Sequence, residues 1–408
     1  MAINKILSRP DHAFWVVTQQ VAVRGLIALK FLLAARLLGP ELIGLVGIAT
    51  LSLAIVESLS DTGLSQAVVQ RHSTINPREA GAVWTLQMSR GIALAIALLL
   101  LAVPIAALFK VSASANLVAL AAVIPLLRNA FNPGVFLVQR DRNFRQLSLY
   151  EASAALLDFA TTLVLIHLGF GAASILLGNI ASDCVKLILS WTWFRVGLRP
   201  TFQWRLIQDL THFGKWIWGS SVVTLVLNQL DKVLVARFLG TTEFGLYQVA
   251  SRIAQLVVAD GAVALGQYLF PTFAKRHRIS PLASRDYLSW IMRRLVPAIV
   301  TIAVVLIAVA GILVNLVLGS EWSDAVPILR VLAVPMLLGA VIAVLVAYLR
   351  GAGKPKVVTQ ATLIQLAVLL IVAPPLLYYF AAVGMASSLA IAGAVVVAYM
   401  FRRIYITQ

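Results

Sequence analysis

Two stretches of the chain, ARLLGPELIGLV at residues 35–46 and ARFLGTTEFGLY at residues 236–247, repeat one another 201 residues apart. Arg36 and Gly39 return as Arg237 and Gly240, and the Gly-Leu pair at 44–45 returns at 245–246. Farther along, the offset grows to 210, where Pro125 and Arg140 are matched by Pro335 and Arg350. Matched Arg, Gly and Pro residues indicate that the chain contains one structural unit twice.

The composition around this repeat is that of a membrane protein. Apolar residues make up 61% of the 408 residues and charged residues 12%, against roughly 45–50% and about 25% in soluble domains. The mean hydropathy of +0.92 is an average over the whole chain, so the apolar character is not confined to one anchor. Only short stretches separate the apolar runs, which excludes a soluble catalytic domain, and we expect no enzymatic activity.

The apolar runs predict about twelve transmembrane helices, because each span needs about 20–27 apolar residues. Bounded by Gly, Pro or charged residues, the predicted spans are 12–38, 42–69, 80–109, 116–138, 147–169, 172–195, 213–239, 244–270, 288–318, 326–349, 357–380 and 383–404.

The charges between the spans predict the orientation. Sixteen Lys and Arg residues fall in the N-terminal segment and the even-numbered loops, whereas the odd-numbered loops contain only Lys110. Loops rich in Lys and Arg stay in the cytoplasm, so we expect both termini there. This bias also accounts for the net charge of +17, and we therefore expect no nucleic-acid partner.

Six spans per repeat is an even number, so both halves enter the membrane in the same orientation. We therefore expect an all-α polytopic membrane protein whose two six-helix lobes, residues 1–205 and 206–408, are related by a pseudo-two-fold axis along the membrane normal. Repeats of this kind enclose a central cavity near the midplane and are typical of transporters.

Five motifs add a family resemblance that extends from the first span to the last. They are Leu38-Gly39-Pro40-Glu41 with Gly44, Asp61-Thr62-Gly63-Leu64 with Gln70-Arg71, Asn228-Gln229-Leu230-Asp231-Lys232, Phe238-Leu239-Gly240 through Phe244-Gly245-Leu246-Tyr247, and Arg350-Gly351-Ala352-Gly353-Lys354-Pro355. In these motifs the chain resembles the polysaccharide transporter family, the lipid-linked oligosaccharide flippase branch of the multidrug/oligosaccharidyl-lipid/polysaccharide exporter superfamily.

The resemblance implies alternating-access export of a sugar unit on polyprenyl pyrophosphate across a bacterial inner membrane, for surface or exopolysaccharide synthesis. Its implied partners are the lipid-linked oligosaccharide and membrane lipids, with polysaccharide polymerase or export machinery as an open further candidate. The chain departs from the related lipid II flippases, whose two additional C-terminal helices form a lipid groove. A multidrug and toxic compound extrusion antiporter is the alternative, and a membrane-embedded polymerase or sugar transferase is a rival from another class.

Charged residues inside the spans are candidates for the transport site, since each needs a partner or water. Arg24, Arg90 and Arg128 lie about 10–12 residues from the cytoplasmic end of their spans, at about the level of Glu57, Asp158 and Asp183. Guanidinium groups at one depth suit a phosphate. The predicted substrate-binding residues are Arg24, Lys30, Arg90, Arg128, Lys232 and Arg252.

Structural ion pairs are the alternative to these functional roles. Arg24 with Glu57 is one such pair, and Asp183 with Lys186, at i, i+3 spacing, is another. The Asn132-Pro133-Gly134 sequence predicts a break in the fourth span beside Arg128, since proline removes a backbone donor.

Energy coupling is expected to use a gradient. The chain has no GxxxxGK[ST] motif, so we expect a secondary transporter without a cofactor or a metal site. A buried carboxylate titrates near neutrality, and the predicted ion-coupling residues are Glu57, Asp61, Asp158 and Asp260.

Overall fold

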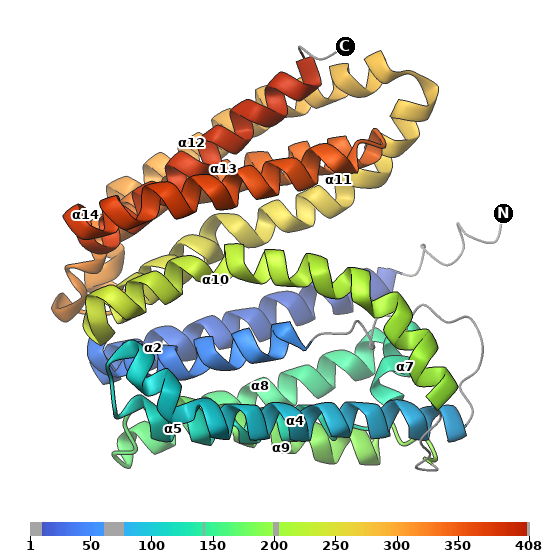
Figure 1. Ribbon diagram of the computed structural model, residues 1–408, viewed down its shortest axis with the longest axis vertical. Helices are drawn as coiled ribbons and strands as arrows, with labels where there is room; N and C mark the ends of the chain where they lie inside the picture. The colour runs from blue at the N-terminus through green and yellow to red at the C-terminus, as the bar shows by residue number, and fades with distance from the viewer. Residues whose placement is uncertain (1–9, 61–76, 142, 199–203, 406–408) are drawn as a thin grey trace. The chain divides into compact units, whose positions relative to one another are not determined.

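The computed structural model describes residues 10–60, 77–141, 143–198 and 204–405, with side chains described outside 10–21, 144, 204–224 and 258–264. These residues form helices and connecting turns, with no β-strand among them. In chain order the helices are α2 (Pro10–Leu59), α4 (Pro77–Phe109), α5 (Ser114–Ala121), α6 (Val123–Asn129), α7 (Gly134–Arg140), α8 (Phe144–His167), α9 (Ala173–Thr192), α10 (Trp204–Ala254), the π-helix η1 (Gln255–Ala259), α11 (Asp260–Ile279), α12 (Pro281–Val317), the 3₁₀-helix η2 (Ser320–Trp322), α13 (Ala325–Gly351) and α14 (Pro355–Tyr405) (Figure 1).

All twelve predicted spans overlap these helices, and the end of the second span, residues 61–69, lies outside the described residues. Helices α2 and α14 each contain two spans, and Figure 1 shows that each doubles back on itself. Helix α10, η1 and α11 together cover the seventh and eighth spans. Seven of the described helices are long and apolar enough to cross a membrane, and the bent group α5–α7 makes eight.

Single residues with left-handed backbone separate the paired spans. Gly39 in α2 has φ 76° and Gly240 in α10 has φ 85°, and these are matched positions of the repeat. Glycine adopts positive φ without the steric cost of a Cβ atom. Ala381 in α14 is the third such residue, with φ 48°. The chain therefore reverses at the ends of apolar runs, where hydropathy placed the boundaries.

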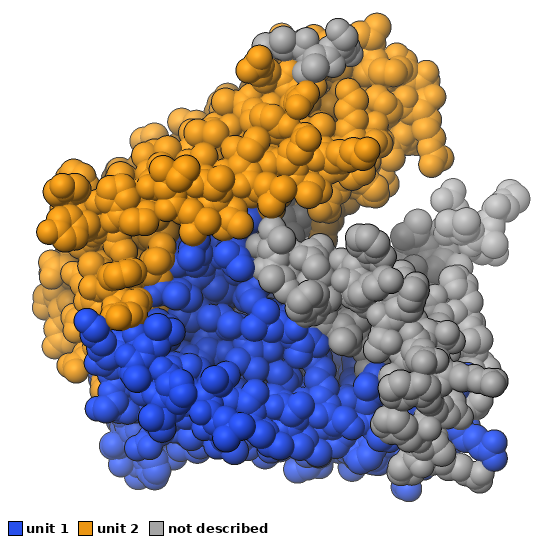
Figure 2. Space-filling view, in the orientation of Figure 1, with its two compact units in different colours: residues 1–38, 45–233 blue, residues 39–44, 234–408 orange. Residues whose placement is uncertain are grey.

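The chain packs as two compact units, shown in different colours in Figure 2. Unit 1 comprises residues 1–38 and 45–233, and unit 2 comprises residues 39–44 and 234–408. The predicted boundary at 205/206 lies two residues into α10, which continues through it without a break. The short segment 39–44 belongs by its contacts to the unit formed by the second half of the chain.

Within unit 2, the two copies of the opening motif meet at their glycines. A Cβ atom on Gly44 would overlap the carbonyl oxygen of Thr241, and a Cβ atom on Gly245 would overlap the carbonyl oxygen of Pro40. In the repeat, Pro40 matches Thr241 and Gly44 matches Gly245. Each contact is therefore the equivalent of the other, with the two copies of the motif interchanged. Their reciprocity is what a local two-fold axis between the repeats requires.

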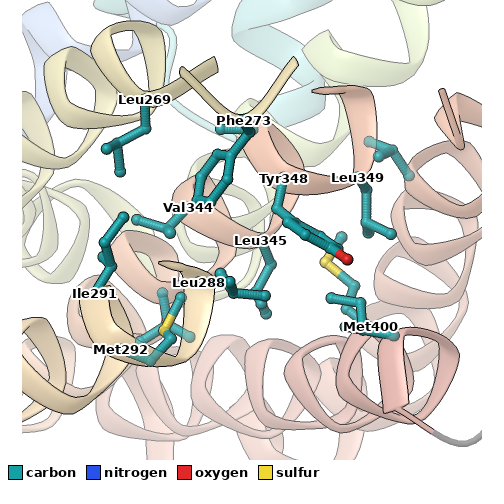
Figure 3. Packing of buried hydrophobic residues seen from close by; sticks show 14 of the residues in the cluster. Leu269, Phe273, Leu288, Ile291, Met292, Val344, Leu345, Tyr348, Leu349 and Met400 are labelled. Carbon is teal, nitrogen blue, oxygen red and sulfur yellow. The ribbon is translucent and has the colours of Figure 1, made fainter. Parts of the chain in front are cut away.

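An apolar core holds the rest of unit 2 together. It is formed where α11, α12, α13 and α14 pack on one another (Figure 3). Phe273, Leu288, Val344, Leu345 and Leu349 are fully buried in it. In unit 1 the corresponding packing joins α8 to α9 and α4 to α5 and α6. These contacts fix the rotation of each helix, and so they decide which polar side chains face one another.

Substituting Gly44 by valine should destabilise the protein, because the new side chain meets backbone atoms of Thr241 that cannot move aside. Overpacking typically costs about 1–3 kcal/mol, and we expect the melting temperature in detergent to fall. Gly311→Val is the matched control, since a Cβ atom there meets nothing within 4 Å. Equal melting temperatures for the two variants would contradict the reciprocal glycine contact.

The charge bias predicts that residues near 278 lie in the cytoplasm and residues near 323 on the opposite side. Arg278 and Ser323 are both exposed, so cysteines at these positions are accessible to an impermeant thiol reagent. The measurement needs a Cys184→Ser background, because Cys184 is the one cysteine in the chain. We expect labelling of Ser323→Cys from outside intact cells, and of Arg278→Cys only after permeabilisation. Both labelling from one side would be incompatible with twelve spans.

Candidate functional site

Five of the ten residues predicted for the transport site lie in two polar clusters of unit 1. The first, which we call the arginine cluster, contains Glu57, Arg90, Arg128 and Asp183 from helices α2, α4, α6 and α9. The second, the lysine cluster, contains Lys30, Asp158, Thr162 and Asn179 from helices α2, α8 and α9. Asp61 and the side chain of Asp260 lie outside the described residues.

In the arginine cluster, Arg128 is bound by two carboxylates. Its Nε donates to Asp183 Oδ2 at 3.0 Å, and its Nη1 lies 3.4 Å from both carboxylate oxygens of Glu57. Asp183 is buried, with 7% of its side chain exposed, whereas 42% of the Arg128 side chain is exposed. The guanidinium group therefore pairs with an acid on one side and keeps part of its surface open.

Arg90 binds the same region through neutral acceptors. Its Nη2 donates to the backbone carbonyl oxygen of Glu57 and its Nε to Ser60 Oγ, each at 3.0 Å. Within the described part of the chain it forms no ion pair. Its positive charge is therefore not cancelled by a bonded carboxylate, which distinguishes it from Arg128. Arg24 is exposed and has contacts of its own.

A break in the fourth span positions Arg128, as the Asn132-Pro133-Gly134 sequence predicted. The segments α5–α6 and α7 meet at an angle of 63°. The carbonyl oxygen of Ala130, freed at the break, accepts hydrogen bonds from Nε1 of Trp84 at 3.2 Å and of Trp191 at 3.1 Å. A backbone group inside a membrane must find such partners, because no water is available in the hydrocarbon region.

The side chain of Asn132 closes the break on its other side. Its Oδ1 accepts from the backbone N–H groups of Gly134 at 2.9 Å and Val196 at 3.2 Å. A Cβ atom on Gly134 would overlap the carbonyl oxygen of Phe194, so only glycine fits there. The bend is thus fixed by hydrogen bonds from neighbouring segments, and Arg128 is held on a rigid element.

In the lysine cluster, a buried ion pair links three helices. Lys30 Nζ donates to Asp158 Oδ2 at 2.7 Å and to Asn179 Oδ1 at 3.0 Å. Lys30 is 6% exposed and Asp158 7%. Thr162 donates to the other oxygen of Asp158 at 3.4 Å, and Gly178 leaves room for this contact because a Cβ atom would overlap Thr162 Oγ1. Lys30, which was predicted to bind substrate, thus forms an ion pair with Asp158, which was predicted to couple transport to an ion gradient.

Lys232 and Arg252 are not members of either cluster. Lys232 donates to Gln229 Oε1 at 3.1 Å on its own helix, and Arg252 is half-buried in the last turn of α10, in unit 2. The i, i+3 spacing suggested that Asp183 pairs with Lys186. The structure pairs Asp183 with Arg128 and Lys186 with Glu151, at 3.0 and 2.7 Å. Both partners come from other helices.

Several members of the site were not predicted from the sequence. Asn179, Thr162 and Ser60 accept or donate hydrogen bonds within the two clusters. Asn179 had a signal, since an amide inside an apolar span needs a partner. Thr162 and Ser60 had none, because hydroxyl groups in helices commonly bond their own backbone.

Comparisons with known proteins agree with the motif resemblance. The model of a family described as "Polysaccharide biosynthesis protein" matches residues 33–327. The lipopolysaccharide biosynthesis protein WzxC of Escherichia coli (strain K12) is 26% identical over 81% of this chain and 67% of its own length. The succinoglycan biosynthesis transport protein ExoT of Rhizobium meliloti (strain 1021) is 25% identical over 86% of this chain and 71% of its own length.

Solved structures share the fold at low sequence identity. The lipid II flippase MurJ in an inward closed conformation has a TM-score of 0.75 at 13% identity, over 96% of this chain and 86% of its own. An inward-facing multidrug resistance MATE family transporter of the MOP superfamily has a TM-score of 0.65 at 16% identity, over 98% and 96%. The predicted all-α polytopic fold of two six-helix repeats is thereby confirmed. Because the family model covers well over half of the chain, this protein belongs to the polysaccharide biosynthesis protein family of membrane transporters, as its motifs predicted.

Proposed function

We propose that this protein is a flippase that carries a polyprenyl-pyrophosphate-linked oligosaccharide from the cytoplasmic to the periplasmic leaflet of a bacterial inner membrane. Membership of the family and the names of its relatives in lipopolysaccharide and succinoglycan synthesis support this assignment. Transport proceeds by alternating access, with both termini in the cytoplasm. The translocated unit then enters surface polysaccharide synthesis through polymerase or export machinery in the same membrane.

The observation that carries the proposal is that Arg90 and Arg128 keep positive charge that bonded acids do not fully cover. Arg90 donates only to neutral oxygens in the described structure, and Arg128 keeps 42% of its side chain exposed. Guanidinium groups bind phosphate oxygens through paired N–H donors, and they stay charged at every physiological pH. Two such groups around Glu57, with Arg24 as the third predicted member, suit a pyrophosphate or an acidic sugar.

The alternative, a multidrug antiporter, rests on the shared fold. A cation exporter needs carboxylates that are free to receive a cation. The carboxylates of the two clusters, Glu57, Asp158 and Asp183, already face Arg128 or Lys30 at 2.7–3.4 Å. The arginine cluster is therefore better prepared for an anion than for a cationic drug, and this observation favours the flippase.

We assign coupling to an ion gradient to the acidic residues. The lysine cluster supports a specific role for one of them, Asp158. Protonation of Asp158 would break its charge pairing with Lys30, leaving a buried ammonium group that must find another partner. Breaking a buried ion pair typically costs about 3–5 kcal/mol. Because of this cost, protonation of Asp158 would favour a different arrangement of the helices around Lys30. Glu57, Asp61 and Asp260 remain the other coupling candidates.

Arg90→Gln should insert and fold normally but bind the lipid-linked sugar about 10–150-fold more weakly, since a charge-assisted hydrogen bond contributes about 1.5–3 kcal/mol. Arg90 is a better test than Arg128, whose removal would also leave the buried Asp183 without its partner. The matched control is Arg330→Gln, because Arg330 likewise donates to a backbone carbonyl, that of Ile307 at 3.2 Å. The measurement is substrate affinity of the purified variants, and equal affinities would contradict an anion site at Arg90.

Replacing both members of the buried pair separates coupling from stability. Asp158→Asn alone should be strongly destabilised, because Lys30 is left charged and buried. The double variant Lys30→Gln/Asp158→Asn should recover the melting temperature, since neither residue is then charged. If Asp158 carries the proton, transport by the double variant no longer responds to a pH gradient. A preserved response to the gradient would make the pair purely structural.

A further inference from the structure

A second basic surface lies in unit 2, where α11 ends and α12 begins (Figure 1). Ser280 caps α12 by accepting a hydrogen bond from the backbone N–H of Ala283 at 3.3 Å, and Pro281 occupies the first helical turn. This tight connection places the last turns of α11 beside the first turns of α12. We call the face that they form together the turn surface; it lies outside both polar clusters of unit 1.

Aromatic rings and guanidinium groups form one continuous stack on the turn surface. The Arg276 guanidinium lies 4.0 Å from the ring centre of Tyr287, and Tyr287 stacks on Trp290 with centroids 5.7 Å apart and planes at 17°. Arg294 lies 3.8 Å from the ring centre of Trp290. Stacking engages the flat face of a guanidinium group and leaves its N–H edge available for an anion.

Basic residues outnumber acids in this segment. Residues 275–294 contain six Lys and Arg residues and one acid, Asp286. Among the described residues, Arg276 and Arg294 form no ion pair and no hydrogen bond, so their donors are unused. Guanidinium groups form strong, charge-assisted hydrogen bonds with phosphate and carboxylate oxygens, so an anion suits these exposed donors.

Two adjoining hollows give the surface room for a ligand. One of about 560 Å³ is lined by residues that include Pro271, Lys275, Arg276 and Ile279. The other, of about 520 Å³, is lined by Arg276, Ala283, Asp286, Tyr287 and Trp290. Arg276 and Ala283 line both hollows, so the cationic group stands between two mainly apolar compartments.

Large apolar side chains are exposed around the basic groups. Ile279 is 76% exposed, Leu282 64% and Trp290 49%. Tryptophan beside Lys and Arg is typical of the membrane–water interface, where the ring sits at the level of the lipid headgroups. A free phosphate would leave these apolar side chains uncovered, whereas acyl chains cover them.

We infer that the turn surface binds an anionic diacyl phospholipid, with Lys275 and Arg276 on the phosphate and the acyl chains along Ile279 and Trp290. Basic pockets between transmembrane helices bind anionic headgroups in this way. The charge bias puts this loop at the cytoplasmic leaflet. The site is independent of the transported substrate, because it uses only residues of α11 and α12.

The test is quenching of Trp290 fluorescence by brominated lipids in the purified full-length protein. The chain contains nine tryptophans, so the Trp290 contribution is the difference between the protein and its Trp290→Phe variant. We expect brominated phosphatidylglycerol to quench this contribution more effectively than brominated phosphatidylcholine. Lys275→Gln/Arg276→Gln should reduce the relative affinity for phosphatidylglycerol by about 5-fold for each charge removed.

The matched control is Lys354→Gln/Lys356→Gln, which removes two exposed positive charges from the α13–α14 connection and the first turn of α14. It should retain the preference for phosphatidylglycerol, since neither lysine lines the hollows. No preference in the unmodified protein, or an equal loss in the control, would overturn the site. Displacement of phosphatidylglycerol by excess inorganic pyrophosphate would also overturn it, by showing a phosphate site that needs no lipid.

Discussion

The cost of placing a charge in hydrocarbon, about 2.5–3.5 kcal/mol on insertion scales, governs the arrangement of unit 1. Lys30, Asp158 and Asp183 are each less than a tenth exposed, and each has an oppositely charged partner at 2.7–3.0 Å. Those partners come from different helices, so the pairs join α2 to α8 and α6 to α9. The same requirement explains why two tryptophans donate to the carbonyl oxygen of Ala130 where the fourth span breaks.

In contrast to these buried ion pairs, the charges of Arg90 and Arg128 are not fully covered by bonded acids, and these two residues mark the proposed substrate site. Arg128 is only partly covered by its two acids, and Arg90 bonds to neutral oxygens. An anionic headgroup could accept hydrogen bonds from both guanidinium groups without displacing a buried ion pair. The turn surface of unit 2 also has guanidinium donors without a bonded carboxylate among the described residues, because stacking on aromatic rings leaves the N–H edges of Arg276 and Arg294 free. The two anion sites that we propose thus use different residues and bind different ligands.

The fold could be predicted from the sequence, whereas most partners of the charged residues could not. Hydropathy located the spans because every one of them must bury its backbone in lipid, and the repeat placed Gly39 and Gly240 at matched ends. The pairing of Arg128 with Asp183 depends on the 63° bend and on the rotation of α9, which spacing along one helix does not determine. For that reason Lys186 pairs with Glu151 rather than with Asp183. The reciprocal contacts of Gly44 and Gly245 likewise appear only once the segments are packed.

Translocation of an anionic lipid-linked sugar can be measured in proteoliposomes that contain the purified protein and a defined polyprenyl-pyrophosphate oligosaccharide. A membrane-impermeant oxidant of the sugar, added to one side, measures how much of the lipid-linked sugar has crossed. We expect protein-dependent loss of the protected fraction, and no protein-dependent efflux of a cationic dye from the same vesicles. A protected fraction that stays constant while the dye is exported would contradict the flippase proposal and favour a multidrug antiporter.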